Sequence, residues 1–74
     1  MNTGIIKTLL YAEKFYPFRI HHKKGRTYDV PDREFAWVSP IGVFVAIETG
    51  GQRHLEILNP SLIEKISTHE EADI

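Results

Sequence analysis

Five side chains that can carry positive charge lie close together in the first half of the chain. On a β-hairpin they would gather on one face and at the tip, where cations can contact the phosphate groups of a nucleic acid. The same pattern is typical of a solvated strand face whose charges discourage sheet edges from pairing, and we favour this second interpretation. The candidate residues for nucleic-acid or partner binding are Arg19, His21, Lys23, Lys24 and Arg26.

Histidine is the other residue type here that could do chemistry, as a metal ligand. His21 and His22 are adjacent, so on a strand they point to opposite faces and do not easily share an ion. His54 and His69 lie in no ligand spacing, and the chain has no cysteine. Nucleophile-elbow, phosphate-loop and paired-carboxylate motifs are also missing from the sequence. We therefore expect no metal, no cofactor and no enzymatic activity.

The cations are positioned by residues 15–30, whose alternation of apolar and polar side chains predicts a hairpin. A two-residue loop would set core side chains opposite solvent-facing ones, whereas a three-residue loop ending at Gly25 aligns the two strands. This loop type ends in a residue with positive φ, a conformation that glycine adopts without strain. The predicted opposite pairs are Phe18–Val30 and Ile20–Tyr28.

The rest of the chain predicts short strands, with a bend in the second strand after Pro31. Leu55 and Ile57 alternate with polar residues and are expected to point inward. Trp37 is expected in the core, although with Phe35 it could instead line a peptide groove. The predicted elements are a helix over 3–14 with Thr3 as N-cap, hairpin strands joined by the loop 23–25, an extended stretch 35–38, turns at 39–42, 49–52 and 59–62, and strands over 43–47, 53–58 and 63–66.

These elements predict a mainly β fold in one small domain, residues 1–66, followed by an acidic disordered tail, residues 67–74. We expect an N-terminal helix and then a five-stranded, strongly bent antiparallel sheet or small barrel of the SH3 or Sm type. The 74 residues allow only a thin core, and small domains often gain stability by oligomerisation. We therefore expect self-association, with 43–47 as one strand that could pair at a sheet edge.

Charge is unevenly divided along the chain. Residues 1–28 carry a net charge of +5 and residues 29–74 a net charge of −6, a division that suggests an interaction surface. The acidic tail could dock on the basic hairpin, although we favour a solubilising role for it. The sequence has no membrane-length apolar segment, and we expect a cytoplasmic protein.

The chain also resembles a group of short, uncharacterised bacterial proteins, and this resemblance implies no function. It extends over nearly the whole chain. The matching residues are Pro17-Phe18-Arg19-Ile20, Gly25-Arg26, Val30-Pro31, Glu34-Phe35, Ser39-Pro40, Ile57-Leu58, Leu62-Ile63 and Ile66.

In element order the chain resembles Sm-like proteins, including the RNA chaperone Hfq. That resemblance implies ring assembly and RNA binding. Hfq has a Tyr-Lys-His run before its last strand, where this chain has Leu58-Asn59-Pro60-Ser61, so no RNA-binding residue carries over. We expect an interaction or accessory module that associates with itself or with another protein; the alternative is an RNA-binding barrel that uses residues 19–26.

Overall fold

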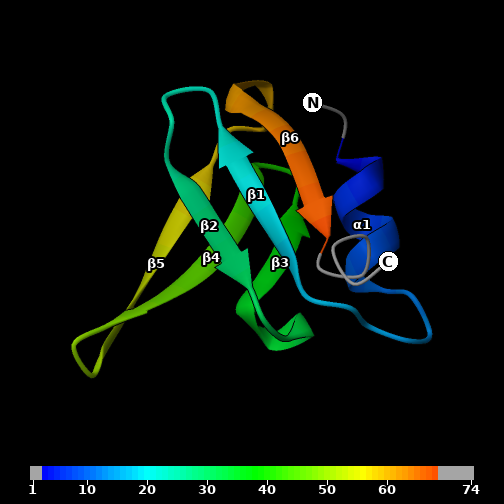
Figure 1. The fold of residues 1–74 in the computed structure, drawn as a ribbon. Coiled ribbons are helices and arrows are strands. Elements are labelled where there is room, and N and C mark those ends of the chain that lie inside the picture. Colours follow the sequence, from blue (N-terminus) through cyan, green and yellow to red (C-terminus); the bar gives the residue numbers. More distant parts are fainter. Residues whose placement is uncertain (1–2, 69–74) are drawn as a thin grey trace.

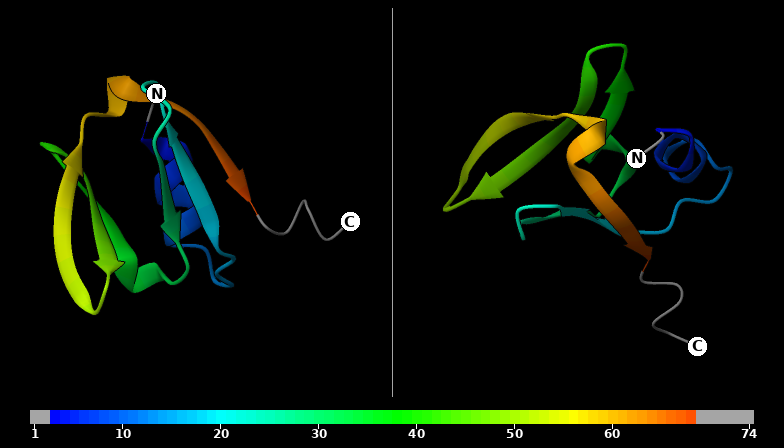
Figure 2. Two further views of the ribbon diagram at one scale, coloured as in Figure 1. Left: turned by 60° about the vertical axis from the view of Figure 1, so that its left-hand side comes forward. Right: turned by 90° about the horizontal axis from the view of Figure 1, so that it is seen from above.

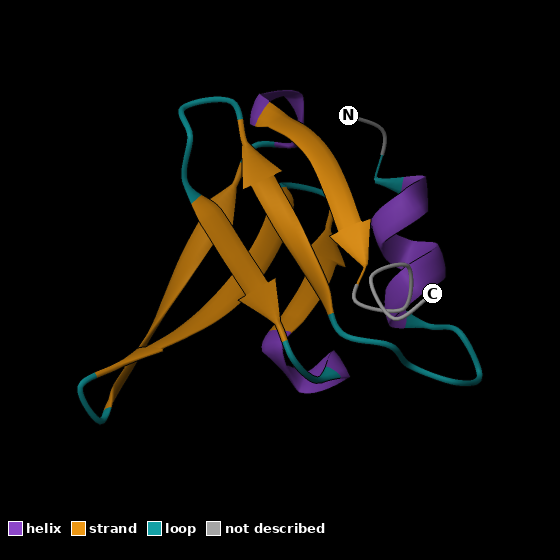
Figure 3. Cartoon of the chain, in the orientation of Figure 1, coloured by secondary structure: helices purple, strands orange, loops and turns teal. Residues whose placement is uncertain are grey.

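The computed structural model of the chain describes residues 3–68. Within that range the chain forms one α-helix, two 3₁₀ helices and six strands, arranged as two three-stranded antiparallel sheets (Figures 1 and 3). The elements in chain order are α1 (Gly4–Leu10), β1 (Phe18–His22), β2 (Thr27–Val30), η1 (Arg33–Phe35), β3 (Ala36–Ser39), β4 (Gly42–Thr49), β5 (Gln52–Leu58), η2 (Pro60–Leu62) and β6 (Ile63–Thr68).

The first sheet has the strand order β2-β1-β6 and confirms the predicted hairpin. Phe18 lies opposite Val30 and Ile20 opposite Tyr28. Gly25 has a φ of +92°, as the three-residue loop requires. Phe18 and Ile20 are both buried, so the side of β1 that was predicted to face the core does so.

The second sheet has the strand order β3-β4-β5. The sequence predicted one strand with a bend after Pro31, whereas the structure has two strands there, β2 and β3, in different sheets. After Pro31, the Asp32 side chain accepts a hydrogen bond from the Arg33 backbone N–H and starts η1. The chain then crosses to the second sheet as β3, which pairs with β4. The described residues therefore form six strands in two sheets, where five strands were predicted, and the sheets do not close into a barrel.

The core lies between the two sheets and under α1 (Figure 2). Its members are buried side chains from α1 and from every strand, including the Phe18 and Tyr28 rings and, on β3, Ala36. Burial of such apolar surface is the main favourable term in folding. β4 is the central strand of its sheet, so the predicted edge pairing by residues 43–47 is wrong; β3 and β5 are the edge strands.

Helix α1 ends at Leu10, four residues before the predicted end. It lies beside β3 and buries Ile6 and Leu10 (Figure 1). A helix this short depends on packing, so it stops where its buried face stops. Beyond it, the Ala12 carbonyl accepts a hydrogen bond from the Arg33 guanidinium instead of continuing the helix. Thr3 occupies the N-cap position but makes no side-chain capping bond.

Strand β6 continues to Thr68, two residues past its predicted end, and pairs with β1. The rest of the predicted acidic tail, residues 69–74, lies outside the described residues, as do the first two residues of the predicted domain. No helix between residues 3 and 68 combines the length and apolarity needed to span a bilayer.

Candidate functional site

Two of the five predicted basic residues are engaged within the first sheet. The Arg19 Nε atom donates to Asp29 Oδ1 at 2.6 Å across the β1–β2 pair, and this neighbour raises the pKa of the guanidinium. His21 Nε2 lies 2.9 Å from the Ser67 hydroxyl on β6. Both side chains lie on the outer side of the sheet, as predicted, but both already have polar partners there.

The other three cations, Lys23, Lys24 and Arg26, lie around the tip of the hairpin. Their side chains are exposed and form no ion pair or hydrogen bond with another described residue. The backbone beneath them is held firmly, because Gly25 N–H donates to the His22 carbonyl and Lys23 N–H donates to the Leu62 carbonyl of η2. The structure therefore brings three of the predicted site residues together on a braced loop.

The histidines lie apart, as the strand alternation predicted. His22 is buried, whereas His21 is on the outer side of β1 and His54 is exposed on β5. Among residues 3–68, no three His, Cys, Asp or Glu side chains are grouped so that they could hold a metal ion. His69 lies outside the described residues.

The outer side of the second sheet carries an apolar surface that the sequence analysis placed in the core. Trp37 lies opposite Phe44, and Phe44 lies opposite Ile57. The Trp37 and Phe44 rings stack in parallel with their centroids 5.0 Å apart. Leu55 is on the same side, because it lies opposite Ala46, two residues from Phe44. We call the side chains of Trp37, Phe44, Leu55 and Ile57 the apolar outer face.

Solvent reaches most of this face, so the inward predictions for three of its members are wrong. Trp37 is 39% exposed, Leu55 53% and Ile57 55%. Phe35, the other predicted core aromatic, is partly buried against the core. At the hairpin end of the face, Arg53 pairs with Glu48 at 2.6 Å.

A signal for this face was present in the hairpin turn. Gly50-Gly51 forms a two-residue turn with positive φ at both positions, and this turn pairs Thr49 with Gln52. Counting back along both strands places Leu58 opposite Val43, so Leu58 belongs to the core side. Leu55 and Ile57 must then face outward.

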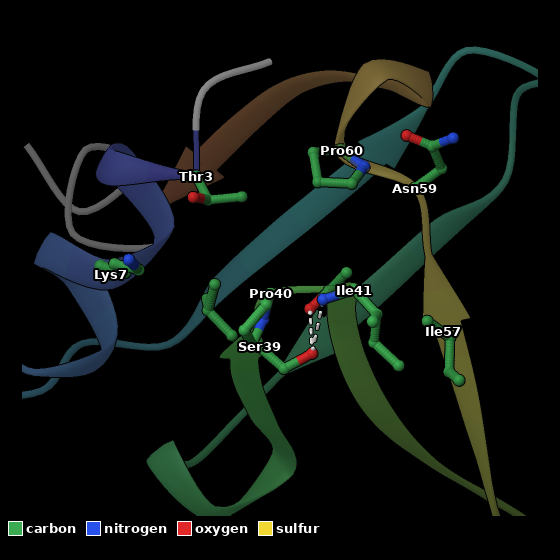
Figure 4. Close-up of a pocket in the computed structure, with 10 residues that line it drawn as sticks. Thr3, Lys7, Ser39, Pro40, Ile41, Ile57, Asn59 and Pro60 are labelled. Carbon is green, nitrogen blue, oxygen red and sulfur yellow. Dashed lines mark hydrogen bonds between the residues drawn. The ribbon is translucent and has the colours of Figure 1, made fainter.

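A cavity of about 680 Å³ lies between the start of α1, the β3–β4 turn and η2 (Figure 4). Most of its polar groups are already paired locally. The Ser39 hydroxyl accepts from Ile41 N–H and donates to the Gly42 carbonyl, and Asn59 Oδ1 accepts from Ser61. Lys7 is the one charged side chain in its lining, so no group of convergent charges marks this cavity as a site.

Comparison of the chain with protein-family models, with curated proteins and with solved structures found no match.

Proposed function

We propose that this protein is a small, non-catalytic interaction module that associates with a second copy of itself through the apolar outer face. The observation that carries the proposal is the exposure of Trp37, Leu55 and Ile57 on one side of one sheet. Scattered exposed apolar residues are ordinary, but a contiguous group that includes a stacked aromatic pair is typical of a binding surface. Aromatic side chains are enriched in the centres of such surfaces.

A second copy suits this face because the face is apolar and would meet an equally apolar surface on the other copy. None of its four side chains is charged, and Glu48 and Arg53 at its hairpin end pair with each other. Two copies related by a two-fold axis would therefore meet without like-charge repulsion. The edge of β5 is also unpaired within residues 3–68, so strand pairing could extend the contact.

Solution mass tests the proposal. Light scattering or sedimentation should show wild-type chains associating at micromolar concentration, and Leu55→Ser combined with Ile57→Ser should give monomers. Ile5→Ser is the matched control, because Ile5 is as exposed as Leu55, at 53%, but belongs to α1 and not to the second sheet. A wild-type chain that is monomeric at high micromolar concentration would remove self-association and leave a different protein as the partner of this face.

The second candidate function is nucleic-acid binding by the hairpin tip. It is favoured by the three unpaired cations Lys23, Lys24 and Arg26 on their braced loop. Three phosphate contacts predict that the logarithm of affinity falls with the logarithm of salt concentration with a slope of about −2 to −3. Gel shifts with short RNA and DNA at two salt concentrations test this. Binding that ignores salt, or that survives Lys23→Glu with Lys24→Glu, would contradict it.

We infer an architectural relation to Sm-like and SH3-like barrels as part of this proposal. It is supported by the order of elements: an N-terminal helix, antiparallel strands and a 3₁₀ turn directly before the last strand. The two separate sheets are then an opened form of such a barrel. This relation predicts assembly into closed rings, and the same mass measurements distinguish a ring from a dimer.

A further inference from the structure

Strand β5 is the least protected of the four edge strands (Figure 1). It is seven residues long, pairs with β4 without a bulge, and contains neither proline nor lysine, the residues that natural edges use against pairing. The edge strands β2 and β3 have four residues each, and a proline directly follows each of them. The edge strand β6 carries Lys65 and pairs with β1 through a register shift. Of these edges, β5 is therefore the one best suited to pair with a further strand.

The hairpin turn decides which backbone groups of β5 point outward. The Gly50-Gly51 turn pairs Thr49 with Gln52, and a two-residue turn of this kind closes on a hydrogen-bonded pair. Hydrogen-bonded and non-hydrogen-bonded pairs alternate along an antiparallel ladder, and the β4–β5 register has no shift. Every second residue from Gln52 onward therefore bonds to β4. The residues between them direct their backbone N–H and C=O groups away from β4, where no other strand of residues 3–68 pairs with them. These residues are Arg53, Leu55 and Ile57.

A second β5 strand, antiparallel to the first, meets these groups best in one register. If a two-fold axis passes beside Leu55, then Leu55 lies opposite Leu55 of the second copy, and Arg53 lies opposite Ile57. Each of these pairs exchanges two hydrogen bonds. A shift of one residue is excluded, because it sets inward side chains opposite outward ones. A shift of two residues either way loses pairs, because Asn59 or Gly51, both outside the strand, then comes opposite an outward residue.

The side chains on the inner side of β5 favour the same register. With the axis at Leu55, His54 of each copy lies opposite Glu56 of the other, so an imidazole meets a carboxylate twice. His54 is exposed and Glu56 is half-buried. Glu56 also interacts with the Tyr28 hydroxyl, but an ionised carboxylate can accept several hydrogen bonds. A shift of two residues would set Glu56 opposite Glu56 or His54 opposite His54, and like charges directly opposite each other are destabilising.

We propose that two copies of this chain pair through antiparallel β5 edges with the two-fold axis at Leu55, and that His54 and Glu56 set the register. This proposal rests on the self-association proposed above and specifies how the two copies meet. Their second sheets join into one continuous sheet, so the two apolar outer faces lie side by side and touch at Leu55 and Ile57. Both Trp37–Phe44 stacks are then presented on the same side of the joined sheet.

Single cysteines locate the axis, because the chain has no cysteine of its own. In the proposed register the two Cα atoms at position 55 lie about 5.5 Å apart, which a disulfide can span. The two Cα atoms at position 53, or at position 57, lie about 13 Å or more apart. Mild oxidation should therefore link Leu55→Cys chains at least about tenfold faster than Arg53→Cys or Ile57→Cys chains. A mixture of the last two variants should form the mixed disulfide faster than either variant forms its own.

The outcomes separate this proposal from the self-association on which it rests. Comparable oxidation rates at the three positions, in chains that light scattering shows to be associated, would overturn the β5 pairing and leave self-association intact. Fastest linkage at position 53 or 57 would overturn the register. A wild-type chain that is monomeric at high micromolar concentration would remove both proposals.

A charge change tests the register without cysteines. His54→Glu sets a carboxylate opposite Glu56 of the second copy twice, so it should weaken association by about tenfold. Gln52→Glu is the matched control, because it adds the same charge at another exposed position on the same side of β5, opposite Leu58 of the second copy. Adding Glu56→Gln to His54→Glu should restore most of the lost affinity. Equal losses in His54→Glu and Gln52→Glu, or no recovery with Glu56→Gln in a chain that keeps its melting temperature, would refute the pairing of His54 with Glu56.

Discussion

The two sheets bury their inner sides in one core, but their outer sides differ. The outer side of β2-β1-β6 is polar, and Arg19 pairs there with Asp29 while His21 contacts Ser67. The outer side of β3-β4-β5 carries the stacked Trp37–Phe44 pair and two exposed aliphatic side chains. The first sheet therefore has one apolar side that is buried in the core and one polar side that faces water. The second sheet carries apolar side chains on both sides, and those on its outer side are partly exposed.

This difference between the two sheets shows when the alternation of apolar and polar residues predicts correctly which side of a strand is buried. In β1 the two possible faces differ in chemistry, so only one assignment buries apolar side chains. In β5 both faces carry apolar residues: Leu58 on one side, Leu55 and Ile57 on the other. Placing the side with more apolar residues in the core is then wrong, because the hairpin turn and the pairing with β4 decide which side of β5 points inward. The side that carries Leu55 and Ile57 is left exposed.

The largest expected effect is the contrast between one aromatic from each sheet. Phe18→Ala should lower the free energy of unfolding by about 3–5 kcal/mol, because Phe18 is almost fully buried in the core. Trp37→Ala should cost only about 1–2 kcal/mol, since it removes a half-exposed ring and its stacking on Phe44. Urea denaturation at protein concentrations too low for association measures both.

Similar losses in the two variants would mean that Trp37 belongs to the core in solution, and the apolar outer face would then be a misreading of the second sheet. If Phe18→Ala does not fold, Phe18→Leu, which removes less volume, provides the comparison with Trp37→Leu.

Much of the first sheet could be predicted from sequence because its constraints are local. Gly25 sets the loop type, the loop sets the register, and the register sets which side chains point inward. The crossing after Pro31 could not be predicted in the same way. The same local residues suit a bend within one strand and a 3₁₀ turn between two strands. Only the pairing of β3 with β4 shows which of the two forms.

The candidate sites were predictable only where charge alone marked them. The basic residues of the hairpin could be recognised from sequence, but the partners of Arg19 and His21 could not, since Asp29 and Ser67 come beside them only through strand pairing. A small cavity beside the β1–β2 loop is lined by both Tyr28 and Glu56, which are distant in the sequence. Such a meeting depends on how two sheets pack, which no short pattern encodes.

The second prediction compares a glycine from each sheet. In Gly42→Ala the new Cβ would lie 2.8 Å from the Leu58 carbonyl oxygen, and the backbone there has a φ of +153°. We expect a loss of about 2–3 kcal/mol in unfolding free energy, because backbone atoms must shift. Gly25→Ala should cost about 1 kcal/mol, from its positive φ alone, since nothing lies within 4 Å of its Cβ position. Thermal or urea unfolding would contradict this if Gly25→Ala were the more damaging.

The third prediction concerns alkaline pH and the one tyrosine enclosed between the sheets. Burial raises the pKa of Tyr28 above its ordinary value of 10.0, so above that pH the unfolded chain loses this proton before the folded chain does. Tyr28 therefore contributes stability that is fully present below pH 10 and is lost as the pH rises through its raised pKa. Unfolding free energy measured on both sides of pH 10 should fall less steeply in Tyr28→Phe than in the wild type. Parallel curves would show that the hydroxyl is solvated.

The smallest expected effects come from the two exposed ion pairs, one on the outer side of each sheet. Double-mutant cycles on Glu48 and Arg53 should give a coupling of about 0.5 kcal/mol, because both side chains are more than half exposed. The Arg19–Asp29 pair is also exposed, and both couplings should disappear in molar salt, where exposed charges are screened. If the Glu48–Arg53 coupling alone persisted in high salt, that pair would be shielded from solvent. Such shielding is what a second copy covering the apolar outer face would cause, so repeating the cycle in the Leu55→Ser, Ile57→Ser background would show whether association is its source.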